Sequence, residues 1–181
     1  LIIEKNTLLS VLGTKNISED MDFKMYKFIC EYLSNNNFKH YEISNFCKDG
    51  YHSRHNTVYW KNLEYYGFGL GASSYIQNKR STNTRSFNKY FSKDYVSSVE
   101  EVSTEDLMEY EVMLGLRLSE GIDKNKFRNR FGKRIDECYN YNELIDNGFI
   151  IDDGDNLFIP EDKFYVSNEI IVKFIEGEKY E

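Results

Sequence analysis

The sequence is poor in the residues and patterns that mark several common classes of protein. Its 181 residues include only three cysteines, none of them in a C-x-x-C pair, and a single proline, Pro160. An odd number of widely spaced cysteines does not predict a disulfide framework. No apolar run approaches the length of a membrane span, so any membrane contact is expected to be peripheral. The net charge of −7 argues against a general nucleic-acid surface.

What remains is the composition of a globular chain. The hydrophobic fraction is 40% and the charged fraction 29%, which predicts one large or two small domains. No secretory signal peptide is visible, so a cytoplasmic setting is the default expectation. The chain begins without methionine at LIIEKNT, where Leu1–Glu4 resembles the end of a buried strand already under way. We therefore expect a fragment of a longer protein.

The first quarter of the chain predicts a strand, a helix and a second strand. After an irregular segment over residues 5–18, Ser18 is a favourable N-cap, and a helix is expected to run to the asparagines at 35–37. Phe38–Phe46 follows as an expected strand. Together with the strand at the start of the chain, this order is typical of an α/β fold with a parallel sheet and outer helices.

An unusual aromatic stretch, residues 51–75, follows. It holds two of the three histidines, the only tryptophan and five of the fifteen tyrosines, and it suits a flat, aromatic, partly charged ligand. Tyr65–Ile76, with glycines at every second position from Gly67 to Gly71, predicts a strand approached closely by another backbone or by a ligand. The glycines also imitate a dinucleotide-binding fingerprint, but no helical pattern follows them, which excludes that site.

The remaining residues predict a change to a helical arrangement. Residues 77–86 have the polar composition of a turn, Phe87–Phe91 the pattern of a short helix, and residues 92–103 that of a connector. Beyond them we expect a helix ending at Gly121, short helices, a hairpin around DDGDN and a last helix from Ser167. This order is typical of a winged-helix arrangement. The predicted domains are 1–95 and 96–181.

The motif HNxxYW, formed by His55, Asn56, Tyr59 and Trp60, carries the sharpest chemical prediction. A neutral imidazole can ligate the iron of a porphyrin, and tyrosine and tryptophan faces can cover the macrocycle. Arg54 could pair with a propionate through two parallel hydrogen bonds. The alternative is a histidine hydrogen-bonded within a loop, with the aromatic side chains filling a core. The residues alone leave both interpretations open.

Other candidate ligands have weaker support. Cys47 could be a soft second ligand for a metal at His55, although a single loop thiol is usually no ligand. His52 and His55 have metal-ligand spacing on a helix, but no third ligand stands near them. His40 is interpreted as structural, and Cys30 and Cys138 as core residues.

A basic segment lies in the predicted winged-helix half. Its six basic residues are Lys124, Lys126, Arg128, Arg130, Lys133 and Arg134. Against three nearby acids the segment has a charge of +3, which could touch nucleic acid. We favour a solvated helix face, because the hairpin and tail that follow are acidic. DDGDN lacks the spacing and the closing glutamate of a calcium loop, and we interpret it as a turn.

The series YEISNF, HNxxYW and YYGFGLGASSYI resembles the oxygen-independent coproporphyrinogen oxidase-like branch of the radical S-adenosylmethionine proteins. Within that branch the HNxxYW motif is more similar to the heme chaperone HemW than to the porphyrinogen oxidase HemN. The resemblance covers nearly the whole chain. It implies the C-terminal part of a radical-SAM partial (β/α) barrel, followed by the small helical, winged-helix-like HemN C-terminal domain.

The resemblance also implies cofactors and partners. It associates His55 with heme binding and carries Asn56, Tyr59 and Trp60 over as motif members. Full-length members bind a [4Fe-4S] cluster and S-adenosylmethionine, but this chain lacks the cluster cysteines and is expected to be inactive in radical chemistry alone. A partial barrel leaves an open sheet edge that is prone to pair with another chain, and a homodimer is one such arrangement.

Three functions remain in competition. The leading one is heme binding and delivery to acceptor proteins by the C-terminal part of a HemW-like heme chaperone. The second is part of an oxygen-independent coproporphyrinogen III oxidase, in which the aromatic stretch would line a porphyrinogen pocket. The third is an interaction module built on the winged-helix half. The HNxxYW motif favours the first.

Overall fold

The computed structural model describes residues 7–13 and 17–177 as a mixed helix and sheet protein. The strand expected at Leu1–Glu4 lies outside the described residues. A short helix, α1 (Leu8–Val11), lies within the segment that was expected to be irregular. The next helix, α2 (Glu19–Asn35), confirms the expected one: the Ser18 hydroxyl accepts a hydrogen bond from the Met21 amide and caps its first turn.

The single strand expected over Phe38–Phe46 is wrong. The segment is a tight antiparallel hairpin of β1 (Lys39–Glu42) and β2 (Asn45–Cys47). The cause is Glu42, whose buried carboxylate accepts hydrogen bonds from the Ser44 amide and the Asn45 side chain and so closes the turn. Every strand pair in the described sheets is antiparallel, so the expected parallel sheet is not seen there.

The HNxxYW motif lies on a helix, α3 (Arg54–Trp60), and the loop expected there is wrong. Ser53 explains the difference, because its hydroxyl accepts a hydrogen bond from the Asn56 amide and its carbonyl accepts one from the Thr57 amide. The cap is a single serine without the acidic first turn that usually marks a helix start, which is why the sequence pattern did not reveal it.

A three-stranded antiparallel sheet follows, where the sequence predicted one strand, a turn and a connector. Its strands, in spatial order, are β3 (Ser73–Ile76), β4 (Lys79–Asn83) and β5 (Val96–Glu101). The polar residues 77–86 and the connector 92–103 therefore contain strands, and these predictions are wrong. The short helix α4 (Phe87–Phe91) between β4 and β5 is confirmed.

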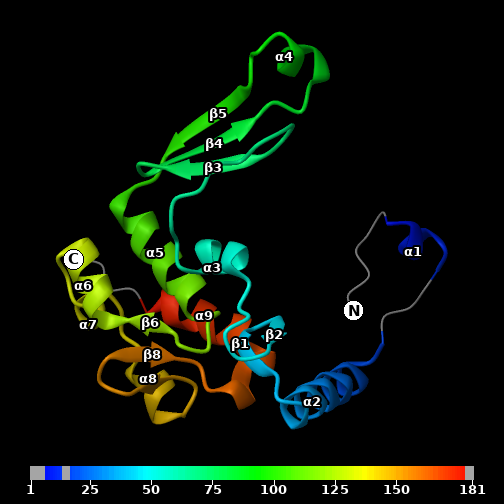
Figure 1. The fold of residues 1–181 in the computed structure, drawn as a ribbon. Coiled ribbons are helices and arrows are strands. Elements are labelled where there is room, and N and C mark those ends of the chain that lie inside the picture. The colour runs from blue at the N-terminus through cyan, green and yellow to red at the C-terminus, as the bar shows by residue number, and fades with distance from the viewer. Residues whose placement is uncertain (1–6, 14–16, 178–181) are drawn as a thin grey trace.

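The glycine-rich segment before β3 is mostly a turn rather than a strand. Gly69 and Gly71 have φ values of +101° and +67°, which interrupt any extended run, and only Tyr65 forms a bridge, to Tyr75. The predicted close backbone approach does occur at Gly67, where a Cβ atom would lie 2.1 Å from the Ser73 carbonyl oxygen. The sheet projects from the rest of the molecule with α4 at its far end, as Figure 1 shows.

The C-terminal region confirms the expected helices and hairpin. Its elements are α5 (Thr104–Gly115), β6 (Ile122–Asp123), α6 (Lys124–Phe131), α7 (Ile135–Cys138), α8 (Asn142–Asp146), β7 (Ile151–Asp152), β8 (Asn156–Phe158), a 3-10 helix (Glu161–Val166) and α9 (Ser167–Glu176). The strand order is β6-β8-β7. The first helix ends at Gly115 instead of Gly121, since Gly121 is needed in the turn that brings β6 against β8 (φ +70°, with a Cβ position 2.1 Å from the Leu157 carbonyl oxygen).

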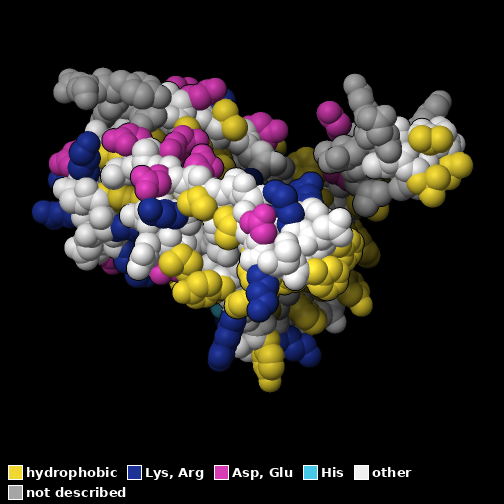
Figure 2. All heavy atoms as spheres, turned by 90° about the horizontal axis from the view of Figure 1, so that it is seen from above, with side chains coloured by type: hydrophobic (Ala, Val, Ile, Leu, Met, Phe, Trp, Pro, Cys, Tyr) yellow, Lys and Arg dark blue, Asp and Glu magenta, His cyan; other side chains and the backbone are white. Residues whose placement is uncertain are grey.

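The main hydrophobic core belongs to this C-terminal region. Its buried residues run from Met108 to Phe174, and Tyr26 of α2 and Ile43 are partly buried against them. By contrast, α2 contains no buried residue, and β5 is exposed along its whole length. Figure 2 shows hydrophobic side chains reaching the surface among charged ones on the face seen from above. None of the described helices is long and apolar enough to cross a bilayer.

Candidate functional site

Helix α3 brings the sequence-predicted site residues together. Arg54 and His55 are exposed in its first turn, and Asn56, Tyr59 and Trp60 are partly buried. The i,i+4 spacing places the side chains of His55 and Tyr59 next to each other on one face of the helix. The prediction that HNxxYW forms one local cluster is therefore consistent with the geometry, although the cluster is helical.

The His55 imidazole contacts a series of tyrosine rings. The Tyr59 hydroxyl lies 3.2 Å from Nε2 of His55, and the two rings are perpendicular at a centroid distance of 4.9 Å. Tyr59 in turn meets the edge of Tyr65 at 4.6 Å. Tyr65 is joined to Tyr75 by two backbone hydrogen bonds, each of 2.9 Å. The imidazole thus stands at the exposed end of an aromatic series whose other end, Tyr75, is only 2% exposed.

A polar network, which we call the Glu111–Arg130 network, contacts this aromatic series at Tyr75. Its members are Asn62, Tyr75, Glu111 and Arg130. The Arg130 guanidinium is 2.6 Å from the Glu111 carboxylate and donates to the Tyr75 hydroxyl at 3.3 Å. It also donates to the Asn62 carbonyl at 3.4 Å. The network therefore ties α5 and α6 to the residue that follows α3 and to β3.

Glu111 is the titratable group that this arrangement perturbs. Burial raises the pKa of its carboxyl, and the neighbouring Arg130 charge and the Asn62 amide oppose that shift only in part. Asn62 donates to Glu111 at 3.3 Å and is itself buried with a positive φ of 48°. An asparagine just after a helix end is a recognised left-handed position, so Asn62 could have been found from sequence, whereas its partners could not.

Trp60 occupies the inner end of α3. It lines a cavity of about 640 Å³ together with Leu63, Gly115 and Leu118. The Arg117 guanidinium lies 5.8 Å from the centroid of its ring. Its indole Nε1 is buried without a hydrogen-bond partner among the described residues. Trp60 therefore fixes α3 against α5 and turns away from the surface on which His55 is exposed.

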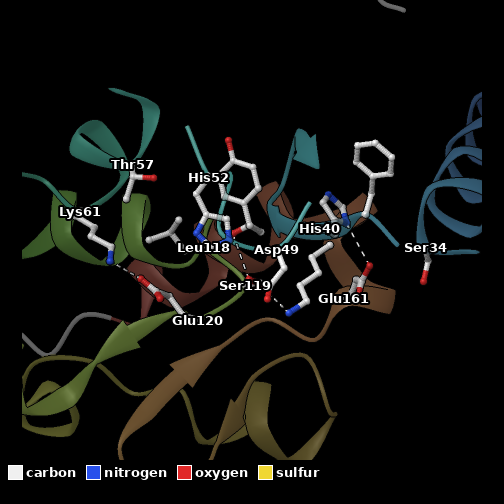
Figure 3. A pocket seen from close by; sticks show the side chains of 13 residues that line it. Ser34, His40, Asp49, His52, Thr57, Lys61, Leu118, Ser119, Glu120 and Glu161 are labelled. Atoms are coloured by element: carbon white, nitrogen blue, oxygen red, sulfur yellow. Dashed lines mark hydrogen bonds and ion pairs between the residues drawn. The ribbon is translucent and has the colours of Figure 1, made fainter. Parts of the chain in front are cut away.

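A second cavity, of about 410 Å³, lies beside α3 and was not predicted from sequence (Figure 3). Thr57 and Lys61 line it, and Lys61 forms a 2.8 Å ion pair with Glu120. Across from them the His52 ring stacks on Tyr41 at 4.9 Å. His55 does not line this cavity or the one beside Trp60. His55, the predicted heme ligand, therefore lies outside both of the cavities that other residues of α3 line.

His40, on the wall of the cavity in Figure 3, has the surroundings of a structural residue. Its Nε2 lies 3.0 Å from the Ile43 carbonyl oxygen, and its Nδ1 lies 3.5 Å from Glu161. The ring stacks on Phe46 at 4.0 Å. These contacts hold the β1–β2 hairpin against the C-terminal region.

The described residues contain no group of three or more His, Cys, Asp or Glu side chains that could hold a metal ion. Cys30 and Cys47 are free thiols. Burial raises the pKa of the Cys47 thiol, which disfavours the thiolate that a metal would bind. Among the predicted ligands, His52 and His55 are exposed, and the His52 ring is stacked on Tyr41, which leaves the His55 imidazole as the candidate with the access that a large, flat molecule needs.

The basic segment is largely neutralised within the protein. Four of its six side chains form ion pairs, Lys124 with Asp152, Lys126 with Asp123, Arg130 with Glu111, and Arg134 with Asp136. Paired charges contribute little to the counterion release that drives binding to nucleic acids. The arrangement therefore supports the solvated helix face that the sequence favoured.

The donors on α3 fit a heme as a surface-bound molecule. The exposed imidazole could supply a ligand to the iron, and the Tyr59 ring lies beside it as apolar surface, packed in turn on Tyr65. Arg54, one residue away and exposed, can reach a carboxylate of a ligand held there. The site is open, so it would hold such a ligand by few contacts.

Comparison with known proteins shows which family the chain is similar to. The model of the HemN C-terminal domain matches residues 102–162. The chain is 32% identical over 184 residues to the heme chaperone HemW of Lactococcus lactis subsp. lactis (strain IL1403) and 29% identical over 188 residues to that of Bacillus subtilis (strain 168). Each match covers 97% of this chain, against 48% and 49% of the relatives. The chain thus spans about half the length of the curated relatives it matches.

A shorter match is more similar in sequence. The heme chaperone HemW of Synechocystis sp. (strain ATCC 27184 / PCC 6803 / Kazusa) is 43% identical over 105 residues, which cover 54% of this chain. Among solved structures, coproporphyrinogen III oxidase (HemN) from Escherichia coli, described as a radical SAM enzyme, matches with a TM-score of 0.65. It is 11% identical and the match covers 87% of this chain and 42% of that one, so the likeness concerns the fold alone.

Proposed function

The chain belongs to the HemN and HemW family of radical S-adenosylmethionine proteins and carries its C-terminal domain, and on this premise we propose that it binds heme through His55 for delivery to acceptor proteins. The observation that carries the proposal is the exposed imidazole on the first turn of α3, in contact with the ring of Tyr59, which is in turn packed on Tyr65. His55, the histidine of the HNxxYW motif on which the resemblance rests, is exposed here outside the core.

An open site suits a protein that must give its ligand away. A chaperone for heme needs access to the iron ligand from solvent, whereas an enzyme that keeps a heme encloses it. His55 is exposed and lines neither of the two cavities beside α3. Arg54 would pair with a propionate and orient the ligand, and Asn56, whose amide is held by the Ser53 cap, would keep the turn in shape.

Other parts of the proposal concern the longer protein. We infer that a full-length member binds a [4Fe-4S] cluster and S-adenosylmethionine through residues outside this chain, and that the setting is cytoplasmic. We retain the division into a partial-barrel part (1–95) and a HemN C-terminal part (96–181) as a proposal, although the β3–β4–β5 sheet continues across residue 95. A homodimer, by pairing of the exposed strand β5, is likewise part of the proposal.

A second candidate function follows from the fold. The similarity to coproporphyrinogen III oxidase supports a role in a porphyrinogen oxidase, with the aromatic stretch facing the substrate. The sequence matches favour the first proposal, because the relatives named here that cover most of the chain are described as heme chaperones. Production of protoporphyrinogen by a full-length protein without oxygen would favour the second.

The test is a hemin titration followed by absorption on the chain, on His55→Ala and on His52→Ala as a matched control. His52 is also exposed and lies three residues away, but its ring stacks on Tyr41. We expect a saturable Soret shift for the unchanged chain and for His52→Ala, and a loss of affinity of at least about tenfold for His55→Ala. Equal binding by all three proteins would contradict the proposal, since it would mean adsorption to apolar surface.

A further inference from the structure

We propose that the Tyr59 hydroxyl and heme iron are alternative partners of one atom, Nε2 of His55, so that Tyr59 weakens heme binding and assists heme release. The inference rests on the proposed function, because the same imidazole is involved. It makes Tyr59 a positioning residue whose hydroxyl acts through His55 and loses its hydrogen bond whenever the ligand enters. Its basis is the geometry of the helix face.

The first step concerns which ring nitrogen meets iron. Nδ1 is bonded to Cγ, the ring carbon that carries Cβ, and so lies close to the helix backbone. A macrocycle centred on Nδ1 would therefore collide with α3. Nε2 is the outer nitrogen and the one that a large flat ligand can approach. In the structure this atom is already occupied, because the Tyr59 hydroxyl lies 3.2 Å away from it.

The second step is that the two partners exclude each other. A metal–imidazole bond is about 2 Å long. A hydroxyl held at 3.2 Å by the same nitrogen would lie within bonding distance of the metal, so one of the two must move. His55 is at the exposed end of the aromatic series, and the described residues provide no second hydrogen bond for the Tyr59 hydroxyl. The exposed imidazole is therefore the group that turns away from the hydroxyl and returns to it.

The exchange balances without a co-reactant. In the tautomer that carries the imidazole proton on Nδ1, the hydroxyl of Tyr59 donates to the lone pair of Nε2. On binding, this hydrogen bond breaks and the Nε2–iron bond forms from the same lone pair. Tyr59 keeps its proton and the iron keeps its oxidation state. On release the hydrogen bond forms again and offsets part of the bond that is lost.

The third step is that the tyrosine returns to a defined position. Its ring meets the edge of Tyr65 at 4.6 Å, and Tyr65 is held to the buried Tyr75 by two backbone hydrogen bonds. Tyr75 is in turn hydrogen-bonded to Arg130. Tyr59, which competes with iron for Nε2, is thus packed against fixed structure. The His55 imidazole to which it is hydrogen-bonded is on the surface.

The test is the rate of heme transfer from the hemin-loaded chain to excess apomyoglobin, measured by stopped flow for the unchanged chain and for Tyr59→Phe. Tyr59→Phe keeps the ring against Tyr65 and removes only the hydroxyl. We expect release to slow and affinity to rise by about two- to twelvefold, the range that the net contribution of one hydrogen bond spans. Tyr66→Phe, at an exposed tyrosine that takes no part in the bond to His55, is the matched control and should release heme at the original rate.

A second readout does not depend on heme. The ¹⁵N shift of Nε2 in His55, recorded on ligand-free protein with labelled histidine, should change in Tyr59→Phe and stay the same in Tyr66→Phe. Unchanged release in Tyr59→Phe, with binding still lost in His55→Ala, would overturn the role of Tyr59 alone. Weaker binding in Tyr59→Phe would overturn it too, since Tyr59 would then be an iron ligand. Full binding by His55→Ala would overturn both this role and the proposed function.

Discussion

The region before residue 102 and the region after it differ in how far their apolar side chains are buried. Residues 104–176 bury a continuous apolar cluster that includes Phe127, Leu157 and Phe174, each fully buried. The earlier region buries few side chains, leaves Phe68 87% exposed, and has a strand, β5, that is exposed throughout. Yet the candidate site is in the earlier region. A ligand that must be taken up and released needs accessible side chains, and a closed core can provide the rigid support without providing the access.

The two regions are connected at several points, among them the Lys61–Glu120 and His40–Glu161 pairs, and the Glu111–Arg130 network is the connection that includes Tyr75. We call residues 104–176 the closed region and the part before residue 102 the open region. The network joins α5 and α6 of the closed region to Asn62 and Tyr75 of the open region. The difference between the regions therefore predicts that substitutions in the closed region change global stability. Substitutions in the open region should change local order and heme exchange.

The largest expected effect is in the closed core. Phe127→Ala removes a fully buried ring that lies 4.8 Å from Phe131, and it should lower the free energy of unfolding by about 3–5 kcal/mol. Phe68→Ala, the matched change in the open region, should alter it by less than about 0.5 kcal/mol. Urea unfolding followed by circular dichroism measures both. Similar losses for the two variants would remove the distinction between the regions.

An intermediate effect is expected at the connection. Arg130→Met removes the partner of a largely buried carboxylate, since the Glu111 side chain is 19% exposed, and it should cost about 1–3 kcal/mol. Because Tyr75 also loses a donor, heme release should change together with stability. Urea unfolding and the transfer assay test the two effects. A stability loss with unchanged heme release would show that the network does not support the site.

A smaller effect is expected at the caps of two helices. Ser53 caps α3 at 3.3 Å and Ser103 caps α5 at 3.0 Å, and replacing either by alanine should cost about 1 kcal/mol. The loss at Ser103 should appear in global unfolding, because α5 is part of the closed core. The loss at Ser53 should appear as faster amide exchange over residues 54–61 with little change in the midpoint. The reverse pattern would assign α3 to the core.

The smallest effect is a change in pH dependence. Burial raises the pKa of Glu111 in the folded protein, so between its ordinary pKa and the raised value the folded state binds more protons than the unfolded state. This contribution stabilises the protein as the pH falls through that window and is lost as the pH rises. Compared with Glu111→Gln, the unchanged chain should lose relative stability with rising pH above the usual range of a glutamate. A parallel pair of stability curves would contradict the raised pKa.

The sequence predicted best where the pattern was local. The Ser18 cap, the short helix Phe87–Phe91 and the hairpin around DDGDN are each determined by residues within a few positions, and the structure confirms them. The failures have long-range causes. The polar strand Lys79–Asn83 exists because it pairs with β3 and β5 on both sides, and nothing in its own residues predicts that.

The candidate site shows the same division. The HNxxYW residues lie together on one helix, α3, because residues close in sequence are also close in space there. The partners that support it could not be predicted, since Arg130 lies 55 residues from Tyr75 and was interpreted as part of a basic surface. The β1–β2 hairpin was missed because a buried glutamate, an uncommon residue in a core, closes its turn.

The most direct measurement is amide hydrogen exchange of the whole chain with and without one equivalent of hemin, read by mass spectrometry. If the open region carries the site, hemin should slow exchange in residues 53–76 and leave the helices between 104 and 176 unchanged. Protection confined to residues 104–176, with none around His55, would contradict the account and place heme binding in the closed region instead.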